Sequence, residues 1–287
     1  MSNDRCRIGV VAPASRMSAE VAQRVPGLAA SLYPQRTPEI VFHPQCFASH
    51  GHFAGDDEMR ARAFLDIAND ESFDAVWLAR GGYGSCRVAQ AVMCSLTEPS
   101  RRKAYVGYSD GGALLAALYR AGFEAVAHGP MAQDILRDDG EAAVARALAW
   151  MVERSPEALE PTVTRVNKTA AFNITVLSQI LGTPLQPDLD GHVLMLEEVG
   201  EAMYRIDRSL FHITSNAGIR RVSGVMLGRC STITPNDPDF GMNEEEIARY
   251  WCRRSDIAWL GRADIGHDAN NKIVPFGASG TIQVTPR

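Results

Sequence analysis

Short apolar runs alternate with helix-like stretches over the first half of the chain, and this alternation constrains the fold most. The runs have the composition of buried strands and lie at 6–12, 39–43, 73–79, 103–108 and 123–127. Between two of them, Met59, Ala63 and Ile67 lie on one helical face, behind an acidic start that suits a helix N-terminus. Strands that alternate with helices form a parallel sheet covered on both faces. The first half is therefore predicted to be an α/β domain.

The second half is less regular and is predicted to be a smaller, mixed α+β domain. A stretch with two prolines and no apolar periodicity, SPEALEPTVT, separates it from the first half. Beyond this stretch, we expect helices at 174–181, 204–215 and 244–253, and strands at 192–196 and 222–227. The predicted organisation is an N-terminal domain of residues 1–154, a linker at 155–164 and a C-terminal domain of residues 165–287.

Composition places the chain among ordinary globular proteins and excludes several classes of function. Of its 287 residues, 46% are hydrophobic and 22% are charged, and the 29 basic and 34 acidic residues are scattered along the chain. The sequence contains no basic block that would indicate a nucleic-acid partner, and no apolar run is long enough to span a bilayer. The six cysteines include no CxxC pair, which is typical of reduced thiols. We therefore expect a cytoplasmic protein without a membrane or nucleic-acid partner.

The segment GYSDG at 107–111 matches the G-x-S-x-G pattern of serine hydrolases. It follows an apolar run and precedes a helix-like stretch from about Ala113, which is the strand–turn–helix context that the pattern requires. Glycines on both sides of the serine allow a tight turn that lifts the hydroxyl clear of the sheet. The pattern predicts Ser109 as a nucleophile. The alternative is an ordinary glycine-rich turn in which Ser109 only caps the helix.

A second glycine-rich loop, RGGYGS at 80–85, follows the preceding buried strand. In a parallel sheet, neighbouring strand ends meet at one edge, where ligands bind. Two such loops can offer two backbone N–H groups to one oxygen, as an oxyanion hole does. We predict Asp110 as one donor and Gly81 or Gly82 as the other. The loop lacks both the Walker lysine and the G-x-G-x-x-G spacing, so nucleotide binding is disfavoured.

A serine nucleophile needs a base, and the base needs an orienting carboxylate. His267 lies in a polar, glycine-containing loop, whereas His128 follows the strand after the one that leads to Ser109. The candidate carboxylates, Glu197 and Glu198, end an apolar strand. The residues alone leave both choices open.

No metal or cofactor is predicted. His50 and His52 have the spacing of a metal-binding pair, but no nearby carboxylate cluster completes a site. These two histidines are expected in a surface loop.

Seven segments occur in the order found in LD-carboxypeptidases, and together they are specific although each alone is weak. They lie at 11–15, 54–60, 79–85, 107–110, 196–198, 204–208 and 266–267. The chain resembles this family, which includes muramoyltetrapeptide carboxypeptidases and microcin-immunity relatives, over nearly its whole length. The resemblance implies a flavodoxin-like N-terminal domain, a smaller C-terminal domain, an active site between them and a homodimer.

The resemblance also implies a Ser-Glu-His triad, with Ser109 as nucleophile, Glu197 as orienting acid and His267 as general base. The implied reaction releases terminal D-Ala from a murein tetrapeptide by cutting an L-to-D amide bond during cell-wall recycling. Such an exopeptidase needs a group that binds the terminal carboxylate of the substrate. Arg80 and Arg229 are candidates for it, although both fit equally well as structural ion-pair partners.

Two segments depart from the family pattern, ADI at 263–265 and TITPNDPDFGM at 232–242. They leave the predicted triad intact but leave the exact substrate open. The alternative functions are a microcin-immunity-type serine hydrolase of the same family and a general α/β-hydrolase esterase, which shares the G-x-S-x-G pattern.

Overall fold

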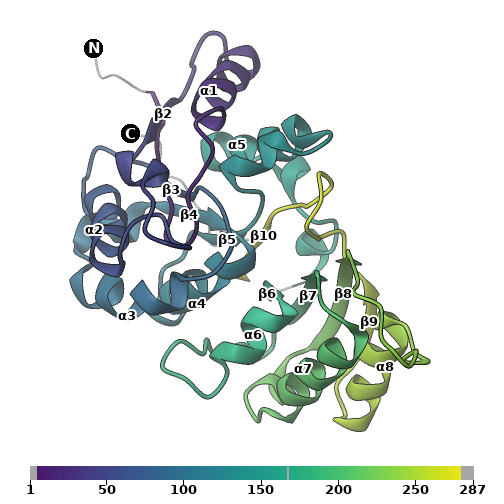
Figure 1. The fold of residues 1–287 in the computed structure, drawn as a ribbon. Coiled ribbons are helices and arrows are strands. Elements are labelled where there is room, and N and C mark those ends of the chain that lie inside the picture. Colours follow the sequence, from purple (N-terminus) through teal and green to yellow (C-terminus); the bar gives the residue numbers. More distant parts are fainter. Residues whose placement is uncertain (1–4, 167, 279–287) are drawn as a thin grey trace.

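Two sheets form the framework of the computed structural model, which describes residues 5–166 and 168–278 (Figure 1). The first sheet has six strands in the order β10-β5-β4-β3-β1-β2. Its parallel strands are β1 (Arg7–Val11), β2 (Glu39–Phe42), β3 (Ala75–Leu78), β4 (Ala104–Gly107) and β5 (Val126–His128), and β10 (Val274–Pro275) runs antiparallel to β5. The order 2-1-3-4-5 is the flavodoxin-like order, so the predicted α/β fold of the N-terminal half is confirmed.

Helices cover both faces of this sheet, because alternate strand residues point to opposite sides. On one face, Val76 and Leu78 pack under α2 (Asp57–Ala68), α3 (Ser85–Ser95) and α4 (Gly112–Arg120). On the other face, Ala75 and Trp77 pack under α1 (Val21–Leu32) and α5 (Gly140–Glu153). This covering explains why the strands read as continuous apolar runs.

The second sheet is more regular than the expected mixed α+β arrangement. Four parallel strands, β6 (Lys168–Asn173), β7 (Val193–Val199), β8 (Gly224–Ser231) and β9 (Trp259–Arg262), alternate with α6 (Ile174–Ile180), α7 (Met203–Ser215) and α8 (Glu244–Arg254). The short β11 (Gly277–Ala278) adds to β6 in the antiparallel direction. Strand β6 was not foreseen, because the sequence KTAAFN is poor in the β-branched residues that favour strands.

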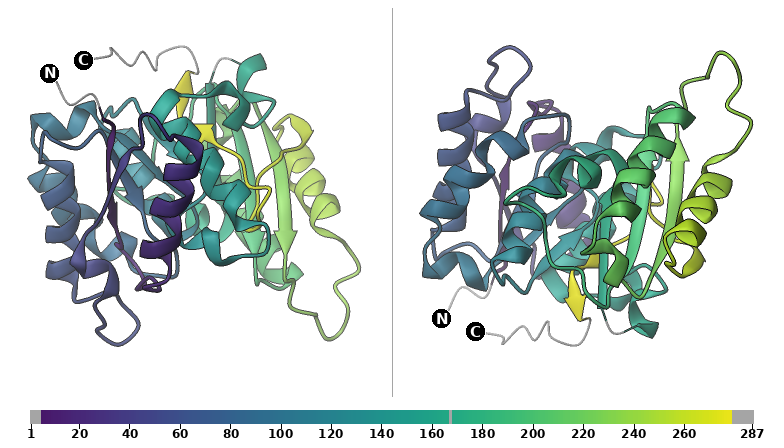
Figure 2. Two further views of the ribbon diagram at one scale, coloured as in Figure 1. Left: turned by 90° about the horizontal axis from the view of Figure 1, so that it is seen from above. Right: turned by 90° about the horizontal axis from the view of Figure 1, so that it is seen from below.

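The chain crosses between the two sheets three times, after β5, after β9 and after β10, and the first two crossings are hydrogen-bonded to each other. The predicted linker lies beside the segment that returns from β9 to β10, because the N–H of Glu160 donates to the carbonyl of Ile273 at 2.9 Å. The N–H of Ile273 donates in turn to the carbonyl of Ala158 at 3.0 Å. Figure 2 shows the two halves side by side, with the yellow return segment between them. This return segment carries His267 and ends in the first sheet.

Candidate active site

Ser109 lies on a strained turn between β4 and α4. The 3₁₀ turn Ser109–Gly111 follows β4, and the φ of Ser109 is +56°, a region that non-glycine residues rarely adopt. A Cβ on Gly107 would lie 2.9 Å from Cβ of Leu78, and one on Gly111 would lie 2.5 Å from its Cδ1. Both glycines of the pattern are therefore packed against β3. This is the geometry that G-x-S-x-G requires for an exposed nucleophile.

The second glycine-rich loop passes directly beside the hydroxyl of Ser109. A Cβ on Gly81 would lie only 2.9 Å from Oγ of Ser109, which leaves room for backbone alone. Gly82 has a φ of +117°, and a Cβ there would collide with Oγ of Ser15. The structure thus brings together the two loops that the sequence predicted as neighbours.

The side chain of Asp110 ties these loops to each other. Its carboxylate accepts hydrogen bonds from the backbone N–H groups of Gly84, at 3.2 Å, and Ser85, at 2.8 Å. Burial raises the pKa of Asp110 above its ordinary value, although these hydrogen bonds oppose the shift. The buried guanidinium of Arg60 also supports this loop, because it donates to the carbonyls of Gly84 and Pro13.

Glu197 and His267 form a buried acid–base pair in the second half. Glu197 lies on β7 and is fully buried, and its Oε2 is 2.5 Å from Nδ1 of His267. Burial lowers the pKa of His267, but the adjacent Glu197 carboxylate outweighs this effect and leaves the pKa raised. Nε2 of His267 and Oε1 of Glu197 are buried without a hydrogen-bond partner among the described residues. The ring therefore has one nitrogen held by Glu197 and one nitrogen that is free to exchange a proton.

The rival carboxylate, Glu198, is committed elsewhere. It accepts hydrogen bonds from the side-chain amide of Asn173 at 2.6 Å, from the backbone N–H and hydroxyl of Thr175, and from the N–H of Val199. The structure therefore brings Glu197, and not Glu198, to the histidine.

The rival base, His128, is a core residue. Its Nε2 lies 3.0 Å from Oδ1 of Asn271, and burial lowers its pKa.

His50 and His52 are exposed, as expected of a surface loop. Within residues 5–166 and 168–278, no group of three or more His, Cys, Asp or Glu side chains could hold a metal. None of the helices in that part of the chain combines the length and apolarity that crossing a membrane requires.

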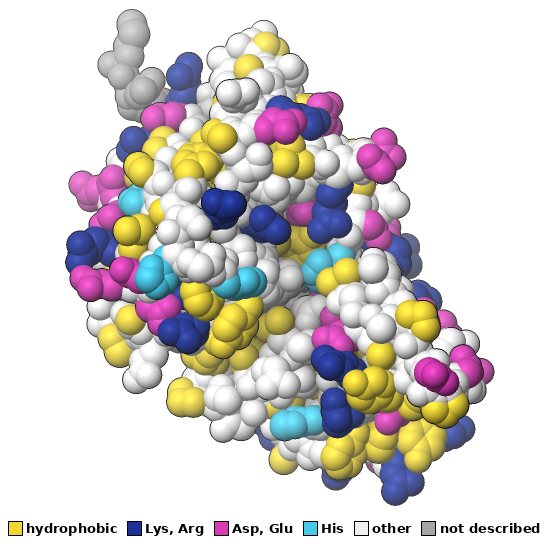
Figure 3. All heavy atoms as spheres, in the orientation of Figure 1, with side chains coloured by type: hydrophobic (Ala, Val, Ile, Leu, Met, Phe, Trp, Pro, Cys, Tyr) yellow, Lys and Arg dark blue, Asp and Glu magenta, His cyan; other side chains and the backbone are white. Residues whose placement is uncertain are grey.

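The two halves of the site meet through Tyr108, the residue before the predicted nucleophile. Its buried ring lies 4.8 Å from the His267 ring, centroid to centroid. Nε2 of His267 makes no hydrogen bond to Ser109, and such contacts often close only when substrate binds. Figure 3 shows a hollow between the two halves, with Lys or Arg and His side chains around it.

The two predicted carboxylate-binding arginines differ in how they are engaged. Arg80 is exposed at the start of the Gly82 loop, and its Nη1 donates to the carbonyl of Arg16 at 3.1 Å. Arg229 pairs with Asp264, at 2.6 Å, and with Asp268, so that it braces the loop that carries His267. These contacts match the structural ion-pair interpretation of Arg229.

Sequence reasoning missed the arginines of the first half that bind main-chain carbonyls of the His267 loop. Arg137 donates to the carbonyl of His267 at 2.6 Å, and Arg146 donates to the carbonyls of Asn271, at 3.1 Å, and Ala269. Every residue carries the same backbone carbonyl, so no sequence motif shows which arginine will bind one.

Two family models match the chain: the LD-carboxypeptidase N-terminal domain at residues 8–129 and the LD-carboxypeptidase C-terminal domain at residues 168–282. A murein tetrapeptide carboxypeptidase of Pseudomonas aeruginosa is 26% identical over 295 residues, which cover 96% of this chain and 93% of the relative. A probable murein peptide carboxypeptidase of Bacillus subtilis is 25% identical over 248 residues, which cover 83% and 77%.

Solved structures show the same fold. A muramoyltetrapeptide carboxypeptidase from Oxalobacter formigenes superposes with a TM-score of 0.77 at 23% identity, covering 94% of this chain and 92% of that one. The protein MccF in complex with glutamyl sulfamoyl guanosine superposes with a TM-score of 0.74 at 14% identity, covering 95% and 91%. The two family models together span more than half of the sequence. The chain therefore belongs to the LD-carboxypeptidase family of peptidases.

Proposed function

We propose that this chain is a serine carboxypeptidase that cleaves the L-to-D amide bond releasing terminal D-Ala from murein tetrapeptides. The observation that carries the proposal is the 2.5 Å contact between Glu197 and His267. The His267 ring packs against the ring of Tyr108, which directly precedes the strained turn of Ser109. Family membership supports the peptidase chemistry, and the names of the bacterial relatives support a murein peptide as the substrate.

In the proposed mechanism, Nε2 of His267 takes the proton of Ser109 as Oγ attacks the amide carbonyl carbon. Glu197 accepts the Nδ1 proton in a hydrogen bond, which fixes the tautomer and stabilises the imidazolium. The oxyanion is bound by the backbone N–H groups of Asp110 and Gly82, and loss of one such donor typically costs about 100- to 1000-fold in rate. His267 then protonates the departing D-Ala amine, and water hydrolyses the acyl-serine by the same steps. No step requires a metal or cofactor.

We propose Arg80 as the group that binds the terminal carboxylate of the substrate. Support comes from its exposed position as the first residue of the loop that passes Ser109. Arg229 is the second candidate, and it would have to release Asp264 or Asp268 to bind substrate.

We also propose that the enzyme is a cytoplasmic homodimer whose chain divides into 1–154, 155–164 and 165–287. The six cysteines are free thiols, which fits a reducing compartment. The homodimer rests on the family resemblance. The two sheets support this division, except that β10, at the end of the return segment, pairs with β5 of the first sheet.

The proposal is tested with three tetrapeptides that differ only in their last residue: D-Ala, D-Ala amide and L-Ala. The free D-Ala peptide should be cleaved. The amide should be about 10- to 100-fold poorer, because it loses the charge-assisted hydrogen bond to Arg80, which is worth about 1.5–3 kcal/mol, and about 1.4 kcal/mol is tenfold. The L-Ala peptide should fail because its methyl and carboxylate exchange places.

Equal kcat/KM on all three peptides would contradict the carboxypeptidase proposal and favour the esterase alternative. An acyl-sulfamoyl nucleoside, the ligand type seen in the MccF structure, distinguishes the microcin-immunity alternative. Faster hydrolysis of that compound than of the D-Ala tetrapeptide would favour this alternative instead.

A further inference from the structure

Arg137 contacts both halves of the candidate site with one guanidinium. The residue follows the 3₁₀ turn Ala132–Leu136 in the first half of the chain. Its Nη1 donates to the main-chain carbonyl of His267 at 2.6 Å, and its Nη2 donates to the hydroxyl of Tyr108 at 3.3 Å. The side chain therefore spans from the residue before the proposed nucleophile to the proposed base.

Asp134 fixes the orientation of this guanidinium. Its Oδ1 accepts from Nε of Arg137 at 2.8 Å and from the Tyr108 hydroxyl at 3.0 Å, and its Oδ2 accepts from the N–H of Met131 at 2.8 Å. Asp134 and Tyr108 are both buried, so the network has few alternative arrangements. A planar guanidinium with three directed donors is a more rigid support than an ammonium group.

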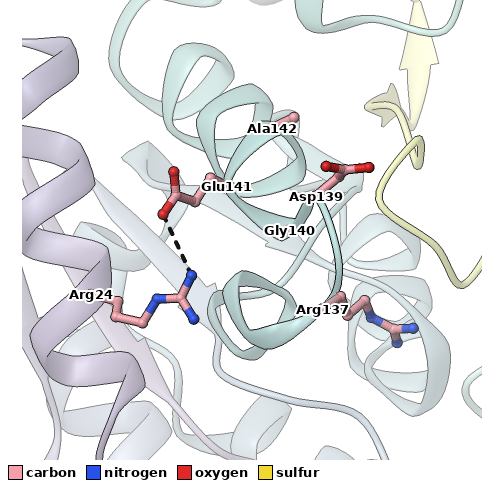
Figure 4. Close-up of a pocket in the computed structure, with 6 residues that line it drawn as sticks. All are labelled: Arg24, Arg137, Asp139, Gly140, Glu141 and Ala142. Atoms are coloured by element: carbon pink, nitrogen blue, oxygen red, sulfur yellow. Dashed lines mark hydrogen bonds and ion pairs between the residues drawn. The ribbon is translucent and has the colours of Figure 1, made fainter.

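A neighbouring arginine, Arg24, makes its ion pairs away from Tyr108 and His267. Arg24 and Arg137 both line a pocket of about 390 Å³ at the start of α5. Figure 4 shows Arg24 turned toward Glu141, with which it pairs at 3.4 Å. The guanidinium of Arg137 points away from that pair. Arg24 therefore provides a matched control in the same pocket.

We infer that Arg137 is a positioning residue, which holds the His267 ring at the Ser109 turn by binding the His267 carbonyl and the Tyr108 hydroxyl together. The inference rests on the proposed function and extends it to a residue outside the triad. The positive charge of Arg137 also lowers the pKa of His267, against the larger influence of Glu197. Loss of that charge should therefore raise the pKa of the base as well as loosen its position.

The test is steady-state kinetics of Arg137→Gln, Arg137→Lys and Arg24→Gln across pH. Arg137→Gln should lower kcat by about 10- to 100-fold with little change in KM, since a misplacement of about 1 Å can cost about 100-fold. The acidic limb of its kcat/KM profile should move to higher pH. Arg137→Lys keeps the charge, so its limb should stay in place while kcat recovers in part. Arg24→Gln should match the wild type in all three respects.

Thermal unfolding of each variant separates a local effect from loss of the fold. If Arg137→Gln does not fold, the kinetics of Arg137→Lys serve as the test. Unchanged kcat and an unchanged pH profile in Arg137→Gln would overturn the inference. A raised KM with unchanged kcat would also overturn it, because Arg137 would then bind substrate. Ser109→Ala is measured in parallel. If Ser109→Ala is inactive while Arg137→Gln is normal, only the inference fails; an active Ser109→Ala removes the proposed function itself.

Discussion

The Ser109 turn and the Glu197–His267 pair are held in place by different kinds of interaction. Around Ser109, backbone and glycine packing set the geometry: Gly107 and Gly111 press against Leu78, and Gly81 passes beside the hydroxyl. Around His267, charged side chains set the geometry, since three arginines bind carboxylates and carbonyls of one loop. These arginines are Arg229, Arg137 and Arg146.

This difference explains what each half contributes and how each can fail. The Ser109 turn is set by close packing of glycines against Leu78 and against the Gly81 loop, all in the first half. The Glu197–His267 contact joins residues 70 positions apart and leaves two buried atoms without partners among the described residues. The second half should therefore respond to changes of charge, and the first half to changes of volume.

Outside Ser109 and His267 themselves, replacement of Glu197 is expected to have the largest effect. Glu197→Gln should lower kcat by about 10⁴-fold, because the comparable change in a serine protease leaves the histidine in the wrong tautomer at that cost. The measurement is D-Ala release by purified enzyme with confirmed secondary structure.

Glu198→Gln is the matched control for this prediction. Its amide would oppose donors from Asn173, Thr175 and Val199, so the free energy of unfolding should fall by about 1–3 kcal/mol for a lost buried acceptor. The folded fraction should keep most of its kcat. An inactive Glu198→Gln variant together with an active Glu197→Gln variant would reverse the assignment of the two carboxylates.

The pH dependence should come from the second half as well. The pKa of His267 is raised above its ordinary value of 6.5, and a general base must be neutral. Hence kcat/KM should fall about tenfold per pH unit below a midpoint that lies above 6.5. A midpoint clearly below 6.5 would contradict the pairing with Glu197.

The same shift has the opposite consequence for stability. The folded state binds the His267 proton more tightly than the unfolded chain does. The stability from this ion pair is therefore complete below the unfolded pKa and is lost as pH rises through the folded pKa. Activity should rise over the range in which this contribution fades.

Volume changes in the first half should have smaller effects. Gly107→Ala should lower the free energy of unfolding by about 1–3 kcal/mol, because the new Cβ meets Cβ of Leu78, which is fixed to the backbone. Gly111→Ala should cost less, since only the mobile Cδ1 of Leu78 is close and the φ of Gly111 is helical. Urea unfolding measures both. Equal stability of the two variants would contradict the packing argument.

The same contrast separates what sequence could predict from what it could not. The G-x-S-x-G turn and the neighbouring glycine loop were predicted from local pattern alone, because backbone geometry restricts residue types within a few positions. The choice of Glu197 and His267 came only from the family resemblance, because their contact is long-range. Arg137 was missed, because its main acceptor is a carbonyl.

The strands of the fold were likewise predicted only in part. The five parallel strands of the first sheet were visible as apolar runs buried on both faces. Strand β6 was missed because its alanines pack closely without a strand-like composition. The return of the chain to β5 rests on a two-residue strand, β10, too short for any periodic pattern.

The central claim is that Ser109 and His267, one from each half, act as a single catalytic unit, and a double-mutant cycle tests it most directly. Ser109→Ala, His267→Ala and the double variant are compared by D-Ala release from the tetrapeptide. In another serine protease, loss of either residue costs about 10⁶-fold, and loss of both costs little more. The same pattern is predicted here, with the double variant no worse than the worse single one. Losses that multiply, or a single variant that keeps more than about a tenth of the activity, would contradict the claim.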